Sequence, residues 1–294
     1  MTALTPDYSE SALGFECAGE RLLGILSRPL RPAATAVVII VGGPQYRVGS
    51  HRQFLLLARA LAATGHAVLR FDYRGMGDSD GAVRSFEEVD ADIGAAIGAL
   101  TAACPEVRSV VLWGLCDGAS AALMYWLRQR DARVRGLCLL NPWVRSEHGL
   151  ARVRLRHYYG DRLLQPNFWS KLLRGRTNLA ASVAELVRNW RLARAARAAE
   201  VDQTESFRSL MAAGFRAFDG EILMILSGCD GTAQEFLDCA KSDPQWAGLL
   251  QRPRLTRLDL PDADHTFTVP AARSAVEEAT RAWIVRLAAP VDGT

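Results

Sequence analysis

The sequence predicts an α/β fold in which a mostly parallel central sheet is flanked by helices and interrupted by an inserted helical cap. Short aliphatic runs recur along the chain, and segments with helical spacing separate the first four of them. This alternation is typical of a parallel sheet with right-handed crossovers. A stretch of about seventy residues rich in Arg, Ala and Leu then precedes the next aliphatic run, and it is too long for an ordinary connection.

The elements are expected in the following order. Two runs near the start predict an antiparallel hairpin, at 12–17 and 22–27. Aliphatic runs predict buried strands at 37–41, 67–71, 110–113, 134–140 and 222–226, and a further strand signal lies at 254–258. Helical spacing predicts helices at 52–63, 86–103 and 119–128, with a closing helix from about 271 to 287.

We therefore expect a core domain at 1–142 and 215–294 and an inserted Arg-rich helical cap at 143–214. The chain carries a net charge of +3, yet residues 144–198 hold twelve Lys and Arg against three acidic residues. A solvated cap surface is the ordinary explanation. The alternative is attraction of an anionic substrate, such as a phosphorylated carrier, an acidic saccharide or an acyl-carrier protein. No recognised module or basic–aromatic array predicts nucleic-acid binding, and the oligomeric state is open.

Composition indicates a globular protein, with 49% hydrophobic and 23% charged residues. No early apolar run could span a bilayer and residues 1–10 lack a signal-peptide pattern, so we expect a cytoplasmic protein without a membrane span. The six cysteines lie far apart, without a C-x-x-C pair or zinc-like clusters. Free thiols are expected in a reducing compartment, with no metal and no organic cofactor.

Residues 114–118, Gly-Leu-Cys-Asp-Gly, follow an aliphatic run and precede a helix-like segment. A strand that turns abruptly into a helix strains the residue at the turn, and flanking glycines allow strand and helix to approach closely. We interpret Cys116 as a nucleophile, whereas a small core-filling cysteine is the alternative. A neighbouring imidazolium or helix N-terminus would favour the thiolate, and Asp117 would oppose it.

A base and an orienting acid are expected at the ends of later strands. His265 lies between the last strand and the closing helix, where a loop can bring the imidazole over the sheet. Asp230 follows the strand at 222–226, so its carboxylate could accept the His265 N–H and fix the tautomer. The alternatives are a backbone-bonding loop histidine, and an Asp230 that caps a helix beginning near Thr232.

Backbone donors for a developing oxyanion are expected from Gly43, after the first buried strand, and from Asp117, after the nucleophile. A plain Gly-Gly-Pro turn is the alternative at 42–44. Gln45, Arg47 and His51 in the same loop are candidate substrate-binding residues, although His51 could equally cap the following helix.

Four segments together resemble the α/β-hydrolase superfamily and, within it, the exosortase A system-associated hydrolase of type 1. They are GGPQYRVGSHRQF at 42–54, FDYRGMGDS at 71–79, GLCDGASAA at 114–122 and DHTF at 264–267. The order nucleophile, acid, base is that of α/β-hydrolases. The resemblance implies an oxyanion loop at 41–44, with Val41 in place of the usual histidine, and an architectural loop at 71–79.

This resemblance implies an α/β-hydrolase fold and a bacterial role beside protein export and exopolysaccharide genes, without identifying a substrate. Dienelactone hydrolases also use cysteine at this turn, but they lack such a cap. We expect hydrolysis of an ester or thioester through a covalent acyl-enzyme formed by Cys116, His265 and Asp230, acting on a small-molecule or carrier-bound acyl substrate. The alternatives are acyl transfer to an amine, thiol or alcohol, and a non-catalytic scaffold of an export or exopolysaccharide system.

Overall fold

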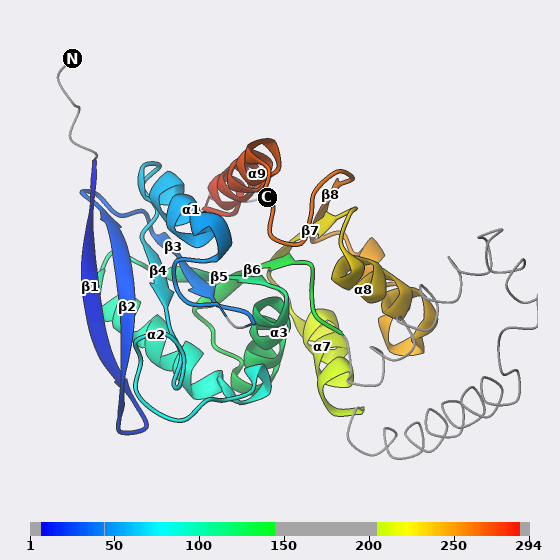
Figure 1. Ribbon diagram of the computed structural model, residues 1–294, viewed down its shortest axis with the longest axis horizontal. Coiled ribbons are helices and arrows are strands. Elements are labelled where there is room, and N and C mark those ends of the chain that lie inside the picture. The colour runs from blue at the N-terminus through cyan, green and yellow to red at the C-terminus, as the bar shows by residue number, and fades with distance from the viewer. Residues whose placement is uncertain (1–6, 44, 145–204, 289–294) are drawn as a thin grey trace, which may run out of the picture. The chain divides into compact units, whose positions relative to one another are not determined.

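A computed structural model describes residues 7–43, 45–144 and 205–288 of the chain. The strands of these residues form one eight-stranded sheet in the order β1-β2-β4-β3-β5-β6-β7-β8 (Figure 1). The strands are β1 (Tyr8–Cys17), β2 (Glu20–Pro29), β3 (Thr35–Ile40), β4 (Val68–Phe71), β5 (Ser109–Leu115), β6 (Val134–Leu140), β7 (Glu221–Ser227) and β8 (Leu255–Leu260).

The sheet is mostly parallel, as the alternation of strand and helix predicts. Strands β3 to β8 pair in parallel, whereas β1 pairs with β2 and β2 with β4 in antiparallel fashion. Every residue of β3 is buried, in keeping with the aliphatic run that follows Thr35. Because parallel strands share one direction, the loops that leave their carboxyl ends meet at one edge of the sheet.

Helices cover both faces of the sheet, which explains why the central strands are apolar throughout (Figure 1). Helix α1 packs against α9, and α2 packs against α3. The described helices are α1 (Gln53–Ala62), α2 (Asp90–Ala103), α3 (Asp117–Gln129), α7 (Glu205–Ala217), α8 (Gly231–Ser242) and α9 (Pro270–Ala288).

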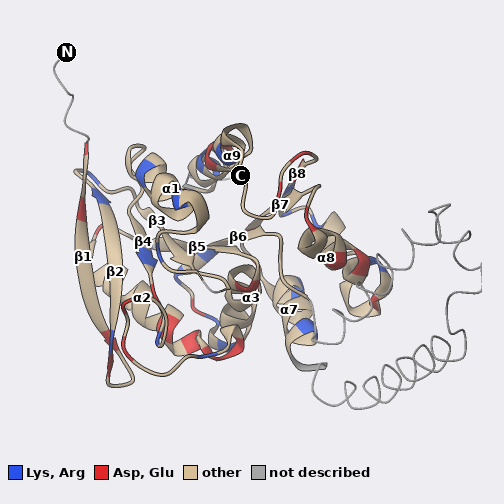
Figure 2. Cartoon of the chain, viewed as in Figure 1, with Lys and Arg blue, Asp and Glu red and all other residues tan. Residues whose placement is uncertain are grey.

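The start of α2 differs from the predicted helix at 86–103. Phe86–Glu88 form a separate 3₁₀ turn, capped by Ser85, and α2 begins only at Asp90. Acidic residues cluster where α2 begins, and Figure 2 colours them red along the ribbon. Negative charge is favourable there because the N-terminal end of a helix carries partial positive charge.

Most of the predicted core lies within the described residues, whereas most of the predicted cap lies outside them. One compact unit contains the described residues up to Val144 and from Ser209 onward, and Arg145–Arg208 form a second unit. Residues 145–204 of the predicted cap at 143–214, with its arginines, lie outside the described residues. Helix α7 crosses the predicted boundary at 214–215, with Met211 and Phe215 buried. The cap itself stays a prediction.

Among the described helices, none is long and apolar enough to cross a bilayer. All six cysteines lie in the described part of the chain, and none forms a disulfide. Within that part, no three His, Cys, Asp or Glu side chains come together in a group that could hold a metal ion.

Candidate active site

Cys116 occupies the sharp turn between β5 and α3. Its backbone has φ 61° and ψ −126°, a conformation that costs a non-glycine residue energy and persists only where surrounding structure enforces it. A Cβ atom on Gly118 would lie 2.5 Å from the Ile40 carbonyl oxygen, and one on Gly114 would overlap the Gly118 backbone. The predicted strand–turn–helix is therefore present, and its glycines are required by close backbone contact.

Backbone hydrogen bonds fix this turn against the end of β6. The Cys116 N–H donates to the Leu140 carbonyl at 2.9 Å, and the Cys116 carbonyl accepts from the Trp143 N–H at 3.2 Å. The Ser120 hydroxyl on α3 donates to the Trp143 carbonyl at 2.7 Å. The side chain of Cys116 is half-buried, so the turn presents it at the carboxyl edge of the sheet without sealing it in the core.

His265 and Asp230 are brought together across 35 positions of the chain. Nδ1 of His265 lies 2.8 Å from Oδ2 of Asp230, and Asp230 is 8% exposed. The same carboxylate also caps α8, accepting the Thr232 N–H at 3.0 Å and the Ala233 N–H at 3.2 Å. Asp230 therefore contacts the imidazole of His265 and caps α8 at the same time.

The environment of Asp230 favours its ionised form. Burial acts to raise the pKa of this carboxyl, but the hydrogen bonds from His265, Thr232 and Ala233 act against it and leave the pKa below its ordinary value. An ionised Asp230 accepts the Nδ1–H of His265. That tautomer leaves Nε2 of a neutral imidazole free to accept a proton.

Asn141 is a residue beside the candidate site that the sequence analysis does not name. It follows β6, is fully buried and has φ 43°. Its Nδ2 donates to Ser227 Oγ at 2.9 Å and to the His265 carbonyl at 3.3 Å, while its Oδ1 accepts the Ser227 N–H at 2.9 Å. Asn141 thus ties the end of β6, beside Cys116, to the loop that carries His265. An asparagine at a strand end, where left-handed backbone is tolerated, is the signal that could have identified it.

The predicted oxyanion donor Gly43 has a partner in this structure. Its N–H donates to Oδ1 of Asp117 at 2.5 Å, across 74 positions of the chain. A Cβ atom on Gly42 would overlap that same carboxylate oxygen, which shows how tightly the 42–43 backbone lies against the turn. The sequence analysis considered the backbone N–H of Asp117 and the effect of its charge on Cys116, but it missed the hydrogen bond between the Asp117 side chain and Gly43.

Burial raises the pKa of the Asp117 carboxyl above its ordinary value. Backbone N–H groups of Gly43, Gly118 and Asp117 itself, together with the charge of His265, act in the opposite direction without cancelling it. The carboxyl groups of Asp117 and Asp230 therefore respond in opposite directions to their surroundings.

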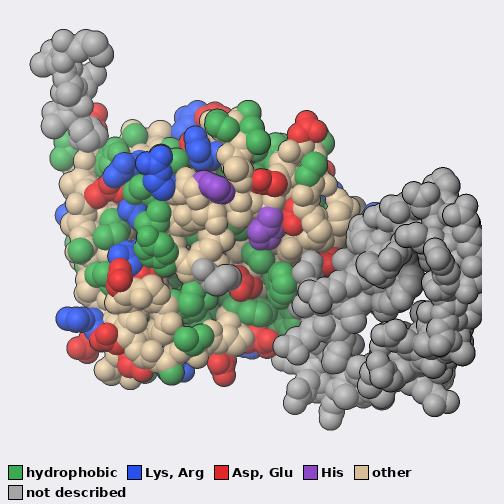
Figure 3. Space-filling model, in the orientation of Figure 1, with side chains coloured by type: hydrophobic (Ala, Val, Ile, Leu, Met, Phe, Trp, Pro, Cys, Tyr) green, Lys and Arg blue, Asp and Glu red, His purple; other side chains and the backbone are tan. Residues whose placement is uncertain are grey.

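The candidate substrate-binding residues occupy the loop before α1. Gln45 accepts the Ser50 N–H at 3.1 Å through its side-chain oxygen, which closes the loop. The Arg47 guanidinium pairs with Asp72 and, at 2.5 Å, with Asp78. His51 is exposed and has φ 51°. Figure 3 shows histidine side chains exposed on the face turned to the viewer. Substrate binding by these three residues stays a prediction.

The loop at 71–79 is held by hydrogen bonds, as its resemblance implied. Ser79 Oγ donates to the Asp72 carbonyl at 2.6 Å and accepts the Leu23 N–H at 2.9 Å. Arg74 makes a bidentate pair with buried Asp92, at 2.9 and 2.8 Å. These contacts anchor the loop to β2 and α2 and leave its residues outside the candidate reacting set.

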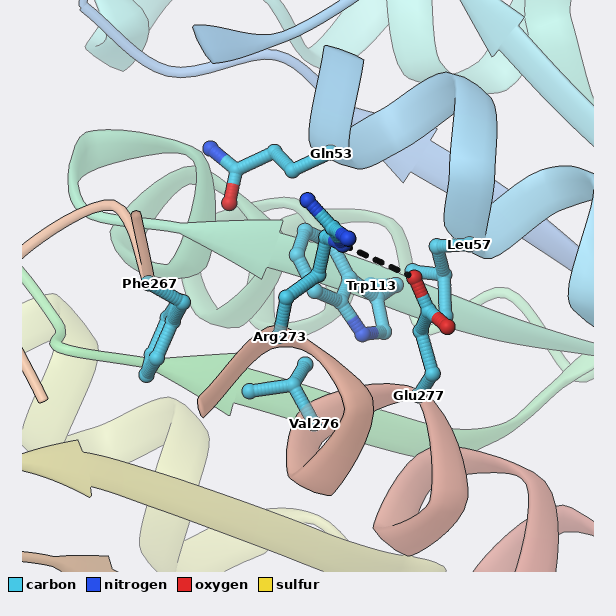
Figure 4. Close-up of a pocket in the computed structure, with 7 residues that line it drawn as sticks. All are labelled: Gln53, Leu57, Trp113, Phe267, Arg273, Val276 and Glu277. Atoms are coloured by element: carbon cyan, nitrogen blue, oxygen red, sulfur yellow. Dashed lines mark ion pairs between the residues drawn. The ribbon is translucent and has the colours of Figure 1, made fainter. Parts of the chain in front are cut away.

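A small pocket lies between α1, β5 and α9, and Figure 4 shows its lining. It is lined by Gln53, Leu57, Trp113, Phe267, Arg273, Val276 and Glu277. Burial raises the pKa of the Glu277 carboxyl, which lies 3.8 Å from the Arg273 guanidinium. Neither Cys116 nor His265 lines this pocket, so it is separate from the candidate site.

Comparisons with known proteins agree with this geometry. The alpha/beta hydrolase family matches residues 37–279. The chain therefore belongs to the alpha/beta hydrolase family, and it is an enzyme of that class. No curated protein matches the chain.

Several solved structures share the fold. The esterase Pf2001 of Pyrococcus furiosus is 14% identical, with a TM-score of 0.64 and 98% of each chain covered. Est1E of Butyrivibrio proteoclasticus, solved with ferulic acid, is 14% identical, with a TM-score of 0.60 over 94% of this chain and 99% of that one. A dienelactone hydrolase of Anabaena variabilis is 14% identical, with a TM-score of 0.59 over 96% and 99%. At these identities the likeness establishes the fold.

Proposed function

We propose that this protein hydrolyses an ester or thioester through a covalent acyl-enzyme formed on Cys116. The observation that supports this most directly is the 2.8 Å contact between Asp230 and His265 at the sheet edge where the strained turn presents Cys116. A nucleophile, a base and a group that orients the base are what acyl transfer requires. Their order along the chain is that of the family.

The first half of the reaction forms the acyl-enzyme. Nε2 of His265 takes the thiol proton, and the sulfur of Cys116 attacks the acyl carbon, so that a C–S bond forms and the carbonyl electron pair moves onto oxygen. The oxyanion then collapses and the bond to the leaving group breaks. The leaving oxygen or sulfur takes the proton back from His265.

The second half returns the enzyme to its starting state. Water loses a proton to His265 and attacks the thioester, the C–S bond breaks, and the imidazolium returns its proton to Cys116. We propose the backbone N–H groups of Gly43 and Asp117 as the oxyanion donors, since both lie at the junction of the 42–43 loop with the turn. Asp230 keeps its charge throughout and stabilises the imidazolium.

Acyl transfer is the second candidate function, and the sulfur at position 116 is the observation that favours it. A thioester intermediate reacts more readily with amines, thiols and alcohols than an oxygen ester does. Such an acceptor would replace water in the second half-reaction, with His265 again taking its proton.

Three finer proposals rest on the sequence. We propose membership of the exosortase A system-associated type 1 group on the four segments that resemble it. We propose a cytoplasmic location because six cysteines occur without a disulfide. An anionic acyl carrier as substrate rests on the Arg-rich stretch at 144–198.

Alkylation kinetics test the proposed nucleophile. Iodoacetamide is reacted with the full chain across a range of pH, and peptide mapping then measures the rate at each of the six cysteines. Exposed Cys229 serves as the internal reference thiol. We expect Cys116 to react fastest and to lose that advantage in His265→Ala.

Intact mass after exposure to a panel of esters and acyl thioesters then identifies the acyl donor, because a trapped adduct has the mass of its acyl group. Cys116→Ala should form no adduct. Alkylation of Cys116 no faster than that of Cys229, with no adduct from any donor, would favour the scaffold and overturn the proposed chemistry.

A further inference from the structure

We propose that the Asp117 side chain occupies the oxyanion hole of the resting enzyme and selects for substrates whose binding displaces it. This inference rests on the proposed function, since it assigns a role to a residue within that site. Asp117 would be a specificity-determining residue that suppresses reaction with small esters. Its side chain would have to leave the Gly43 N–H before an acyl oxygen could use that donor.

An oxygen of the Asp117 carboxylate lies against the Gly43 N–H, which is one of the two donors proposed for the oxyanion of the substrate. Oδ1 accepts a hydrogen bond from the Gly43 nitrogen, 2.5 Å away. Backbone N–H groups of Asp117 and Gly118 also stabilise the charged carboxylate. Gly43 and Asp117 are the two donors proposed for the substrate, so an oxygen of the protein already occupies the site of the substrate oxygen.

The surrounding structure holds the carboxylate in this place. Gly42 lies so close to Oδ1 that a Cβ atom there would overlap it, and α3 begins at Asp117 itself. By contrast, no atom lies within 4 Å of the position that a Cβ atom on Gly43 would take. Space is therefore free on the Cα side of Gly43, whereas its N–H is taken up by the Asp117 carboxylate.

A carboxylate and an oxyanion cannot share one N–H donor at full strength, and two negative charges at this separation repel each other. A substrate must therefore supply binding energy from elsewhere to move the Asp117 side chain. Large acyl donors with extensive contacts can supply it, whereas a small ester has few atoms with which to do so. The resting site is consequently selective against small esters and against accidental acylation.

Two reactions of Cys116 separate this inference from the proposed function. Acylation by p-nitrophenyl acetate passes through an oxyanion and needs the hole, whereas alkylation by iodoacetamide displaces iodide and forms no oxyanion. The ratio of the two rate constants therefore reports on the oxyanion hole and cancels changes in thiolate content. It is measured in the wild type and in Asp117→Ala, Asp117→Asn and Asp238→Asn.

Asp117→Ala removes the occupant, so the ratio of acylation to alkylation should rise by roughly a hundred- to a thousandfold, in line with the usual contribution of one oxyanion donor. Asp117→Asn removes the charge but keeps an oxygen that can accept from Gly43. Its ratio should therefore lie between those of the wild type and Asp117→Ala. Exposed Asp238, on α8, controls for the change in net charge, and its variant should match the wild type.

The outcomes are distinguishable. If Cys116 alkylates rapidly in every variant but Asp117→Ala leaves the ratio unchanged or lowers it, the occupied hole is wrong and the nucleophile stands. If Cys116 alkylates no faster than Cys229 in every variant, the proposed function itself fails. Should Asp117→Ala not fold, Asp117→Ser supplies the same comparison, because it also removes the carboxylate that accepts from Gly43.

Discussion

Replacing Asp230 by asparagine separates the two tasks of its carboxylate. Oδ1 accepts the Thr232 N–H, whereas Oδ2 accepts the Ala233 N–H and contacts Nδ1 of His265. An asparagine that keeps its oxygen toward Thr232 presents an NH₂ group to His265. The imidazole must then accept at Nδ1 and carry its proton on Nε2. That is the wrong tautomer for taking a proton from Cys116.

The expected loss of activity is much larger than the loss of stability. A reversed tautomer lowers kcat by about 10⁴-fold in a comparable triad, which corresponds to roughly 5.5 kcal/mol of transition-state stabilisation. The variant keeps one of its two capping bonds, so its free energy of unfolding should fall by only about 1 kcal/mol. Chemical denaturation and steady-state kinetics on one preparation measure the two quantities.

The pH dependence of stability gives a second readout. The folded pKa of Asp230 lies below its ordinary value, so its ionised form contributes stability above the unfolded pKa. This contribution is lost as the pH falls through the folded pKa. The wild type should therefore lose more stability than Asp230→Asn on going from neutral pH into the acid range.

Asp243→Asn is the matched control for this substitution. Asp243 caps a 3₁₀ turn, accepting the Gln245 N–H at 2.9 Å, and has no histidine partner. It should lose a similar amount of stability and no activity. If Asp230→Asn kept kcat/KM within about threefold of the wild type, Asp230 would not set the tautomer of His265, and the argument would be refuted.

Two further predictions concern the scaffold. Gly118→Ala should lower the free energy of unfolding by about 1–3 kcal/mol, because its Cβ atom would lie 2.5 Å from the Ile40 carbonyl oxygen. Gly98 on α2 is the control: a Cβ atom there meets nothing within 4 Å, so Gly98→Ala should stabilise the protein by up to about 1 kcal/mol. If urea unfolding showed equal changes in the free energy of unfolding for the two variants, the packing argument would be wrong. Asp92→Asn should cost about 1.5–3 kcal/mol, because it removes the nearer of the two carboxylates that pair with buried Arg74 and leaves only Glu20, at 3.7 Å; a loss below about 1 kcal/mol would show that the Asp92 pair is dispensable.

Much of the fold follows from local sequence patterns. Strands β3 to β7 coincide with the predicted aliphatic runs to within a few residues, because strands buried on both faces admit little but aliphatic side chains. Helix α2 begins later than predicted, since Ser85 and Glu88 form a capping box on a separate turn. Helical spacing alone does not reveal that break.

The site was predictable only in part. The turn at Cys116 has a local signature, and the Asp230–His265 contact follows from where two strands end. The bond from Gly43 to Asp117 could not be predicted in this way. It depends on how β3 and β5 align in the sheet, since Ile40 pairs with Gly114 and thereby sets the 42–43 loop beside the turn. The role of Asn141 likewise depends on β6 lying between β5 and β7.

The two carboxylates of the site show why position decides chemistry here. Asp230 accepts hydrogen bonds from the cap of α8 and from His265, and these lower its pKa despite burial. Asp117 has backbone donors of comparable number, yet burial leaves its pKa raised. Under the proposal, the charge of Asp117 lies against the two oxyanion donors although their hydrogen bonds do not offset the cost of its burial. Because burial is not fully offset, release of the carboxylate would relieve an unfavourable charge and leave the proposed donors Gly43 and Asp117 to the oxyanion of an acyl-transfer intermediate.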